Sequence, residues 1–191
     1  MNLTIIAGLG NPGERYQETR HNVGFLAVEA LAQRWSLSWK RGRFESVAAR
    51  GGYKDWECLL VKPQIFMNRS GECLAPFLQF YKASLSDLIV LHDDLDLPLG
   101  RLKIQWGGGD AGHRGIRSLI DALNSQDFIR FRLGIGRPSK GIDPVEYVLK
   151  PWERSEKSEL SQMIGKSVEA LECLLEEGVE VAMNRYHGPQ I

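Results

Sequence analysis

Seven polar side chains lie at the ends of predicted loops, where they could act on a ligand. They are Asn11, Asn68, His21, His92, His113, Asp93 and Asp94. The sequence has no GxSxG motif, and no cysteine sits in a context that would activate its thiol. The simplest site combines a histidine as general base, an aspartate that orients it, and asparagine amides that donate to a carbonyl or oxyanion. Such a set predicts hydrolysis by activated water without a covalent intermediate.

Three carboxylates follow one short apolar strand and suggest a second chemistry. Asp93, Asp94 and Asp96 resemble a divalent-metal site or an acid/base pair. A phosphate or nucleotide hydrolase that used them with Mg²⁺ would lose activity in a chelator. The Asp-Leu-Asp-Leu-Pro alternation instead favours a turn in which at least one carboxylate caps the backbone. We therefore expect no metal, with the magnesium hydrolase as an open alternative.

Two glycine loops, at residues 8–13 and 107–112, match the dinucleotide-binding pattern GxGxxG. In the first loop Pro12 removes a backbone donor, and polar, non-periodic residues separate the loop from the next predicted helix. We therefore expect no dinucleotide and no other cofactor. The second loop leads directly into a predicted helix that carries His113 and Arg114, so its backbone N–H groups favour contact with an anion.

Alternating strand and helix patterns must position these side chains. Apolar runs predict strands at Leu3–Ala7 and Leu88–Leu91, strands in RLKIQW and FIRFRLG, and two antiparallel strands joined near Gly51-Gly52. Helical spacing predicts helices at Val23–Trp35, from a Ser70 cap, at about His113–Leu123, and as an amphipathic cover within Pro151–Ile191. This order indicates an α/β protein whose ligand site lies at the carboxyl ends of its strands.

Composition limits the classes of function. The 191 residues predict one domain over 1–191, and the 24 basic and 24 acidic side chains leave any nucleic-acid contact to a local patch. Arg130 and Arg132 share one strand face, which is either a salt-bridged surface or a series of phosphate contacts. Lys40, Arg41 and Arg43 predict a solvated loop, with RNA contact as the alternative. Scattered cysteines, and the lack of a signal peptide or an 18-residue apolar segment, favour a soluble cytoplasmic protein.

Six motifs in order resemble those of bacterial peptidyl-tRNA hydrolases over essentially the whole chain. They are GLGNPGERYQETRHNVG, KPQIFMNRSG, HDDLDLPLGRLKI, GGGDAGHRG, FRLGIGRP and a final NRYH. The resemblance implies an α/β fold of one domain, a three-layer sandwich with a twisted mixed sheet flanked by helices. It also implies a monomeric, metal-independent enzyme that hydrolyses the ester joining a peptide to tRNA.

The resemblance also implies roles for individual residues. His21 resembles the catalytic base and Asp93 its orienting carboxylate. Asn11 and Asn68 resemble the amides that hold the substrate near the ester. The remaining implied contacts are lining or supporting residues Tyr16, Met67 and His113, and tRNA phosphate contacts Lys103 and Arg132.

Three positions depart from the family pattern. Arg114 stands where the family usually has asparagine, Gln105 replaces a frequently basic residue, and Arg69 follows Asn68 where an apolar residue is common. An arginine can donate to a carbonyl but cannot accept from an N–H. We therefore treat Arg114 as a substrate-binding residue that takes over part of the phosphate role lost at Gln105.

A non-catalytic RNA-binding relative of the family is the alternative to the enzyme. Pure RNA binding requires no base with an orienting carboxylate. The joint presence of His21, Asp93, Asn11 and Asn68 therefore favours the hydrolase.

Overall fold

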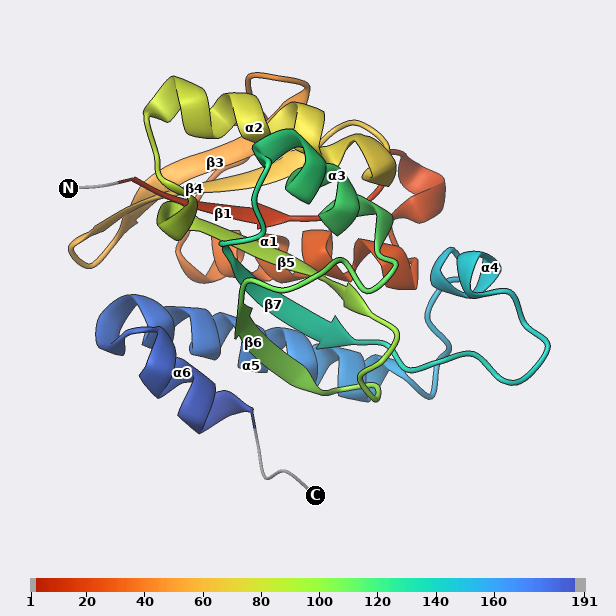
Figure 1. The fold of residues 1–191 in the computed structure, drawn as a ribbon. Coiled ribbons are helices and arrows are strands. Elements are labelled where there is room, and N and C mark those ends of the chain that lie inside the picture. Colours follow the sequence, from red (N-terminus) through yellow and green to blue (C-terminus); the bar gives the residue numbers. More distant parts are fainter. Residues whose placement is uncertain (1–2, 188–191) are drawn as a thin grey trace.

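Figure 1 shows the computed structural model, which describes residues 3–187. Its strands form one mixed sheet in the order β2-β3-β4-β1-β5-β7-β6. Strands β1, β4, β5 and β7 are parallel, whereas β3 pairs antiparallel with β2 and β4, and β6 with β7. The strands are β1 (Leu3–Gly8), β2 (Lys40–Arg41), β3 (Ser46–Tyr53), β4 (Trp56–Pro63), β5 (Leu88–Asp94), β6 (Leu102–Trp106) and β7 (Ile129–Gly134).

Helices cover both faces of the sheet. In Figure 1, α2 and α3 lie on one side of the sheet and α1, α5 and α6 on the other. The helices are α1 (Val23–Arg34), α2 (Ser70–Tyr81), α3 (Arg114–Leu123), α4 (Pro144–Val148), α5 (Lys157–Glu177) and α6 (Val179–Tyr186). Between residues 3 and 187, no helix combines the length and apolar character needed to cross a bilayer.

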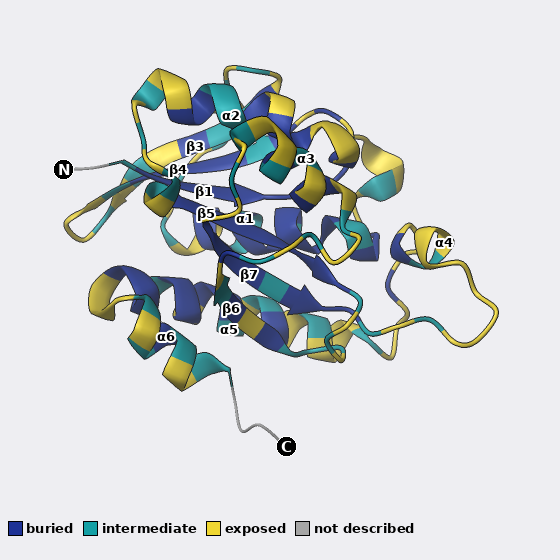
Figure 2. Ribbon diagram, viewed as in Figure 1, coloured by how far each residue is buried: buried dark blue, intermediate teal, exposed yellow. Residues whose placement is uncertain are grey.

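Each face of the sheet carries its own apolar core, because side chains alternate along a strand. Ile5 belongs to the core that contains Leu74 of α2, whereas its neighbour Ile6 belongs to the core that contains Leu171 of α5. Figure 2 shows buried residues concentrated in the sheet and on the helix sides that face it. The predicted α/β class, with a mixed sheet between two helical layers, is confirmed.

The hairpin turn differs from the sequence prediction. Gly51 and Gly52 lie inside β3, and the chain turns at Lys54 and Asp55 instead. A Cβ at Gly51 would lie 2.2 Å from Cδ2 of Leu37. This glycine therefore permits close packing of a side chain onto the strand and does not form the turn.

Two helix predictions also need correction. Arg69 occupies the N-cap position of α2, while the Ser70 hydroxyl donates to the carbonyl oxygen of Met67 at 2.8 Å. The C-terminal cover is two helices, because Gly178 adopts φ +92° between α5 and α6, a conformation that favours glycine. Residues 188–191 of that predicted segment lie outside the described residues.

Helix α1 begins directly against the sheet. A Cβ at Gly8 would lie 2.2 Å from the carbonyl oxygen of Gly24, and a Cβ at Gly24 would lie 2.3 Å from that of Leu91. Paired glycines thus let the first turn of α1 approach the carboxyl ends of β1 and β5. The 3₁₀ turn η2 (Arg20–Asn22) immediately precedes this contact and carries His21 to the same sheet edge.

Candidate active site

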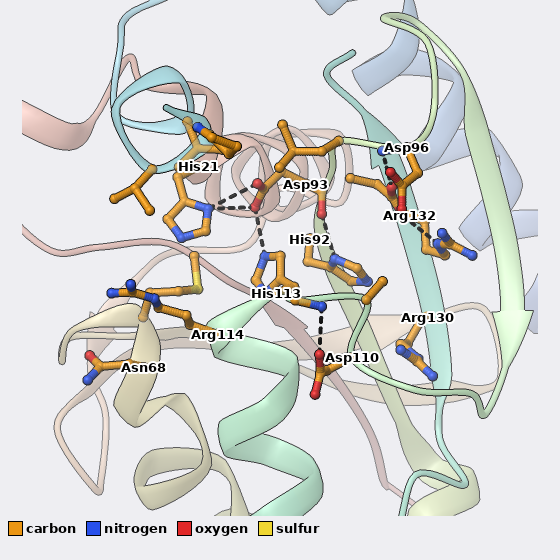
Figure 3. A pocket seen from close by; sticks show the side chains of 18 of the residues that line it. His21, Asn68, His92, Asp93, Asp96, Asp110, His113, Arg114, Arg130 and Arg132 are labelled. Carbon is orange, nitrogen blue, oxygen red and sulfur yellow. Dashed lines mark hydrogen bonds and ion pairs between the residues drawn. The ribbon is translucent and has the colours of Figure 1, made fainter. Parts of the chain in front are cut away.

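A cavity of about 670 Å³ opens at the carboxyl ends of the parallel strands. Figure 3 shows the side chains that line it. Most of the residues predicted from the sequence line this cavity, namely Asn11, His21, Met67, Asn68, Asp93, His113, Arg114 and Arg132. Tyr16 and Lys103 are not among its lining residues; Tyr16 lies in the turn η1 (Glu14–Tyr16), where the Arg15 guanidinium stands 4.6 Å from its ring centre.

Asp93 is the centre of the site. It is the second-to-last residue of β5, with 2% of its surface exposed, and its two oxygens lie 2.9 and 3.0 Å from Nδ1 of His21. One of these oxygens also lies 2.8 Å from Nε2 of His113 (Figure 3). Burial alone would raise the pKa of Asp93, but the two imidazoles hold this pKa well below its usual range. Asp93 is therefore a permanent carboxylate at neutral pH.

Helix α3 fixes which nitrogen of His113 carries the proton. His113 is the N-cap of α3, and its Nδ1 accepts from the backbone N–H groups of Gly115 and Ile116 at 3.1 and 3.2 Å. The proton must then sit on Nε2, which donates to Asp93. The imidazole thus occupies the N–H groups of Gly115 and Ile116, while anion contact at the preceding glycine loop, residues 107–112, stays a prediction.

The same tautomer bears on metal binding. His21, Asp93 and His113 offer ligand atoms within 4.8 Å of one another. Nε2 of His113 could bind a metal only by losing the proton that it gives to Asp93, and the cap on α3 occupies its other nitrogen. This donor set does not fit a three-ligand metal site.

The carboxylates of Asp93, Asp94 and Asp96 do not converge on a common ion site. Asp94 accepts from the backbone N–H of Asp96 at 2.8 Å, so the predicted turn cap is confirmed. Asp96 itself pairs with Arg137 on the surface, while Asp94 pairs with Arg132 at 2.5 Å. Each carboxylate thus has its own partner.

The side-chain oxygen of Asn11 is held by a hydrogen bond, whereas its NH₂ group can bind a ligand. Its Oδ1 accepts from the backbone N–H of Met67 at 2.8 Å, so its NH₂ group is left for the cavity. Asn22 holds the backbone of Asn11 on both sides, since its Oδ1 accepts from Asn11 N at 2.8 Å and its Nδ2 donates to Asn11 O at 2.9 Å. The sequence pattern did not predict this role for Asn22, because its partner atoms belong to the backbone of Asn11.

Asn68 and Arg114 form an exposed rim. They come from the turn η3 (Met67–Arg69) and the first turn of α3, and they lie on the same side of the cavity in Figure 3. Neither side chain has a hydrogen-bond partner within residues 3–187. Arg69 instead pairs with Glu72 on the surface. The rim therefore presents one neutral amide and one guanidinium that can still bind a ligand.

The arginines of β7 differ in their surroundings. Arg130 is 2% exposed and donates to the carbonyl oxygens of the glycine loop at residues 107–109, so it supports that loop and does not face solvent. Arg132 ion-pairs with Asp94 and donates to Oε1 of Gln105 at 2.7 Å. In this structure Arg132 therefore belongs to a salt-bridged surface, which is one of the two alternatives predicted for this strand face. Lys103, opposite Arg132 in the register, is exposed.

His92 is a buried imidazole that sequence reasoning left without a role. Its Nδ1–H donates to the carbonyl oxygen of Asp93 at 2.7 Å, and its ring meets that of His113 edge to face at 4.8 Å. Its Nε2 has no hydrogen-bond partner within residues 3–187. Burial, with a smaller contribution from the neighbouring His113 imidazole, lowers the pKa of His92 well below its usual value.

The fold and the site define a class of protein. Nδ1–H of His21 donates to a buried carboxylate, which leaves the Nε2 lone pair for the cavity and makes this ring suited to activating water. Neutral amide donors face the same space. These features are those of an α/β enzyme that hydrolyses a carbonyl compound through a general base.

Comparison with known proteins narrows this class. A family model described as "Peptidyl-tRNA hydrolase" matches residues 5–191. Peptidyl-tRNA hydrolase of Bacillus subtilis is 42% identical over 97% of this chain and 98% of the relative, and that of Geotalea daltonii is 43% identical over 100% of both. The crystal structure of peptidyl-tRNA hydrolase from Acinetobacter baumannii superposes with a TM-score of 0.93 at 33% identity, covering 99% of this chain and 96% of the other. The chain belongs to the peptidyl-tRNA hydrolase family and is a hydrolase that acts in translation.

Proposed function

We propose that the cavity hydrolyses the ester bond of peptidyl-tRNA with His21 as the general base. The observation that supports this most directly is the pair of contacts, 2.9 and 3.0 Å, between Nδ1 of His21 and the carboxylate of Asp93. Nε2 takes a proton from water as the water attacks the ester carbonyl carbon. Asp93 stabilises the imidazolium that forms. The tetrahedral intermediate then collapses with cleavage of the ester C–O bond, and the imidazolium returns its proton to the departing 3′ oxygen of the tRNA. Water itself is the nucleophile, so no acyl-enzyme forms.

The amide groups select the acyl part of the substrate. The NH₂ group of Asn11 donates to a carbonyl oxygen near the ester, and Asn68 on the rim pairs with the peptide amide that follows. A peptidyl ester offers amides and carbonyls to these neutral groups. An aminoacyl ester offers an ammonium that they would leave poorly paired, which disfavours its cleavage. Met67 and His113 support this arrangement from the cavity wall and Tyr16 from outside it.

Positive side chains along one edge of the cavity contact the tRNA backbone. Lys103 is exposed beside Arg132, and both lie on the strand face that carries Gln105. Arg114 is available at the rim, which supports its role in place of a basic residue at Gln105. Arg132 would exchange its contact with Gln105 for a phosphate oxygen.

We place the enzyme in the cytoplasm as a monomer. The proposed mechanism uses His21, Asp93 and Asn11 of one chain and needs no residue of a second copy. Burial raises the pKa values of the Cys58 and Cys73 thiols to about 12, which suits permanently reduced core cysteines. The relatives carry the name of an enzyme, so the comparisons do not favour the non-catalytic RNA-binding alternative.

The test is an assay of N-acetyl-aminoacyl-tRNA cleavage by the wild-type protein and by His21→Ala. We expect kcat/KM to fall by about 10² to 10⁴ in the variant, because the general base is lost. His187→Gln is a matched control, since His187 contacts the β6 edge outside the cavity and should leave kcat unchanged. EDTA treatment, with the tRNA kept folded by monovalent salt, should have no effect. Loss of activity in EDTA would support the magnesium hydrolase instead, and full activity of His21→Ala would refute the proposed base.

A further inference from the structure

Arg20, the residue before the proposed base, is buried although it is charged. Its side chain is 3% exposed, and its Nη2 lies 2.7 Å from Oε2 of Glu156. Its Nη1 donates to two main-chain carbonyl oxygens, those of Pro151 at 2.9 Å and Lys150 at 3.3 Å. One guanidinium therefore holds three acceptors that lie 130 to 136 residues further along the chain.

Aromatic and backbone contacts strengthen the same junction. The guanidinium carbon of Arg20 lies 4.4 Å from the ring centre of Tyr147 and 5.4 Å from that of Trp152. The backbone N–H of Arg20 donates to Lys150 O at 3.2 Å, and that of Trp152 donates to Glu18 O at 3.1 Å. The segment 147–156 is thus fastened to the turn that carries His21.

The fastened segment continues into a wall of the cavity. Four residues of α4 and its C-terminal end line the cavity, namely Pro144, Val145, Val148 and Leu149. Val145 is 44% exposed and Leu149 is 37% exposed, so apolar surface is open to the solvent at this wall. Such a surface suits an apolar side chain of the acyl group bound next to the ester.

Stability alone does not explain this junction. Burying a guanidinium carries a large desolvation cost, and well-packed apolar residues often replace a buried ion pair without loss of stability. The Nε of Arg20 also lacks a hydrogen-bond partner within residues 3–187. What the junction does supply is a fixed geometry, because Asp93 holds the ring of His21 while the neighbouring Arg20 holds the α4 wall.

We infer that Arg20 is a positioning residue that fixes the α4 wall relative to His21 and thereby sets the affinity for the acyl group. The inference builds on the hydrolytic mechanism proposed above. Loosening the junction moves the wall but leaves the His21–Asp93 contact in place. Binding of a bulky acyl group should then weaken equally in the ground state and in the transition state, which raises KM and leaves kcat nearly unchanged.

The test compares N-acetylphenylalanyl-tRNA with N-acetylglycyl-tRNA as substrates of Arg20→Lys and Glu156→Gln. Lysine keeps a positive charge but cannot reach two carbonyls with a planar fork or stack between two rings. Glu156→Gln weakens the junction without changing the turn that carries His21, so this variant tests the inference even if Arg20→Lys folds poorly. Arg34→Lys is the matched control, because Arg34 forms an exposed ion pair with Glu172 away from the cavity.

For the phenylalanyl substrate we expect KM to rise about tenfold in both variants, while kcat stays within about twofold of the wild-type value. For the glycyl substrate we expect KM to rise by less than about twofold. An equal change for the two substrates, or a fall in kcat with KM unchanged, would show a merely structural role and overturn the inference. If the wild-type protein cleaves neither substrate, the hydrolytic mechanism itself fails and the inference fails with it.

Discussion

At the scale of single residues, the site depends on one carboxylate that serves two imidazoles. Asp93 accepts from His21 and from His113, but the two rings differ in what they can do next. His113 has both nitrogens engaged, one by Asp93 and one by the start of α3. His21 alone keeps a lone pair free toward the cavity, which is why we assign the base to it.

Replacing Asp93 by Asn should remove the constraint on the tautomer of His21. An amide can donate as well as accept, so Nδ1 of His21 no longer has to carry the proton, and kcat/KM should fall by about 10⁴. The measurement is cleavage of N-acetyl-aminoacyl-tRNA, with Asp121→Asn on the exposed side of α3 as the control. An Asp93→Asn enzyme within tenfold of the wild type would contradict the orienting role.

Burial of His92 in neutral form should make the fold sensitive to acid. The pKa of His92 is depressed in the folded state, so below about pH 6.5 the unfolded chain binds a proton that the folded chain does not. The free energy of unfolding therefore decreases as the pH is lowered, by up to about 1.4 kcal/mol per pH unit. His113, Asp93 and Arg130 face this ring and stay in place in a His92→Asn variant, whose amide can still donate to Asp93 O. The free energy of unfolding, measured in urea between pH 7 and 5, should depend less steeply on pH in His92→Asn than in the wild type. An identical pH dependence in the two proteins would refute this account.

The sequence allowed prediction of residues whose chemistry is evident from type, but not of their supports. His21, Asp93 and Asn11 were accessible because few polar side chains follow predicted strands. Asn22 and Arg20 were not, because their partners lie at the backbone of Asn11 and at residues 147–156, which no local pattern connects to them. Long-range pairing was the missing information.

At the scale of elements, close glycine contacts decide how near the turn that carries His21 comes to the sheet. Helix periodicity predicted α1, since its apolar side chains repeat at helical spacing. It did not reveal that Gly8 and Gly24 pack so closely that a Cβ on Gly8 would clash with the carbonyl oxygen of Gly24. For the same reason Gly51 was misread as a turn, because a glycine in sequence does not disclose whether it serves conformation or proximity.

A pair of alanine substitutions separates these two uses of glycine. Gly24→Ala should destabilise the protein by about 1 to 3 kcal/mol, because its Cβ would press on Leu91 O, and it should also lower kcat by displacing the His21 turn. Gly165→Ala on the open side of α5 meets no atom within 4 Å and should stabilise by about 0.5 to 1 kcal/mol. Urea denaturation measures both, and equal effects would refute the packing explanation.

At the scale of the whole molecule, zero net charge makes RNA binding a matter of local placement. Composition limits a basic site to a local patch, but it could not choose between the Lys40 loop and the β6–β7 face. That choice depends on which strands border the cavity. Gln105 of β6 and Arg132 of β7 line it, while β2 lies at the opposite edge of the sheet.

Salt dependence of tRNA binding should distinguish these two surfaces. Lys103→Gln should reduce the slope of log affinity against log salt by about 1, because one phosphate contact is lost. Lys40→Gln, on the edge strand β2, should leave the slope unchanged. Filter binding with a catalytically inactive His21→Ala background keeps the ligand intact. If only Lys40→Gln reduced the salt slope, the tRNA would bind at the β2 edge of the sheet and not at the β6–β7 face.

The distances along the chain that the site must bridge bear on the synthesis of the protein itself. His21 meets Asp93 across 72 residues, and Arg20 meets Glu156 across 136. Until a ribosome has translated codon 156, the emerging polypeptide carries His21 and Arg20 but cannot form the Arg20–Glu156 ion pair. A nascent chain therefore cannot fix the α4 wall relative to His21 until the segment 147–156 has been synthesised.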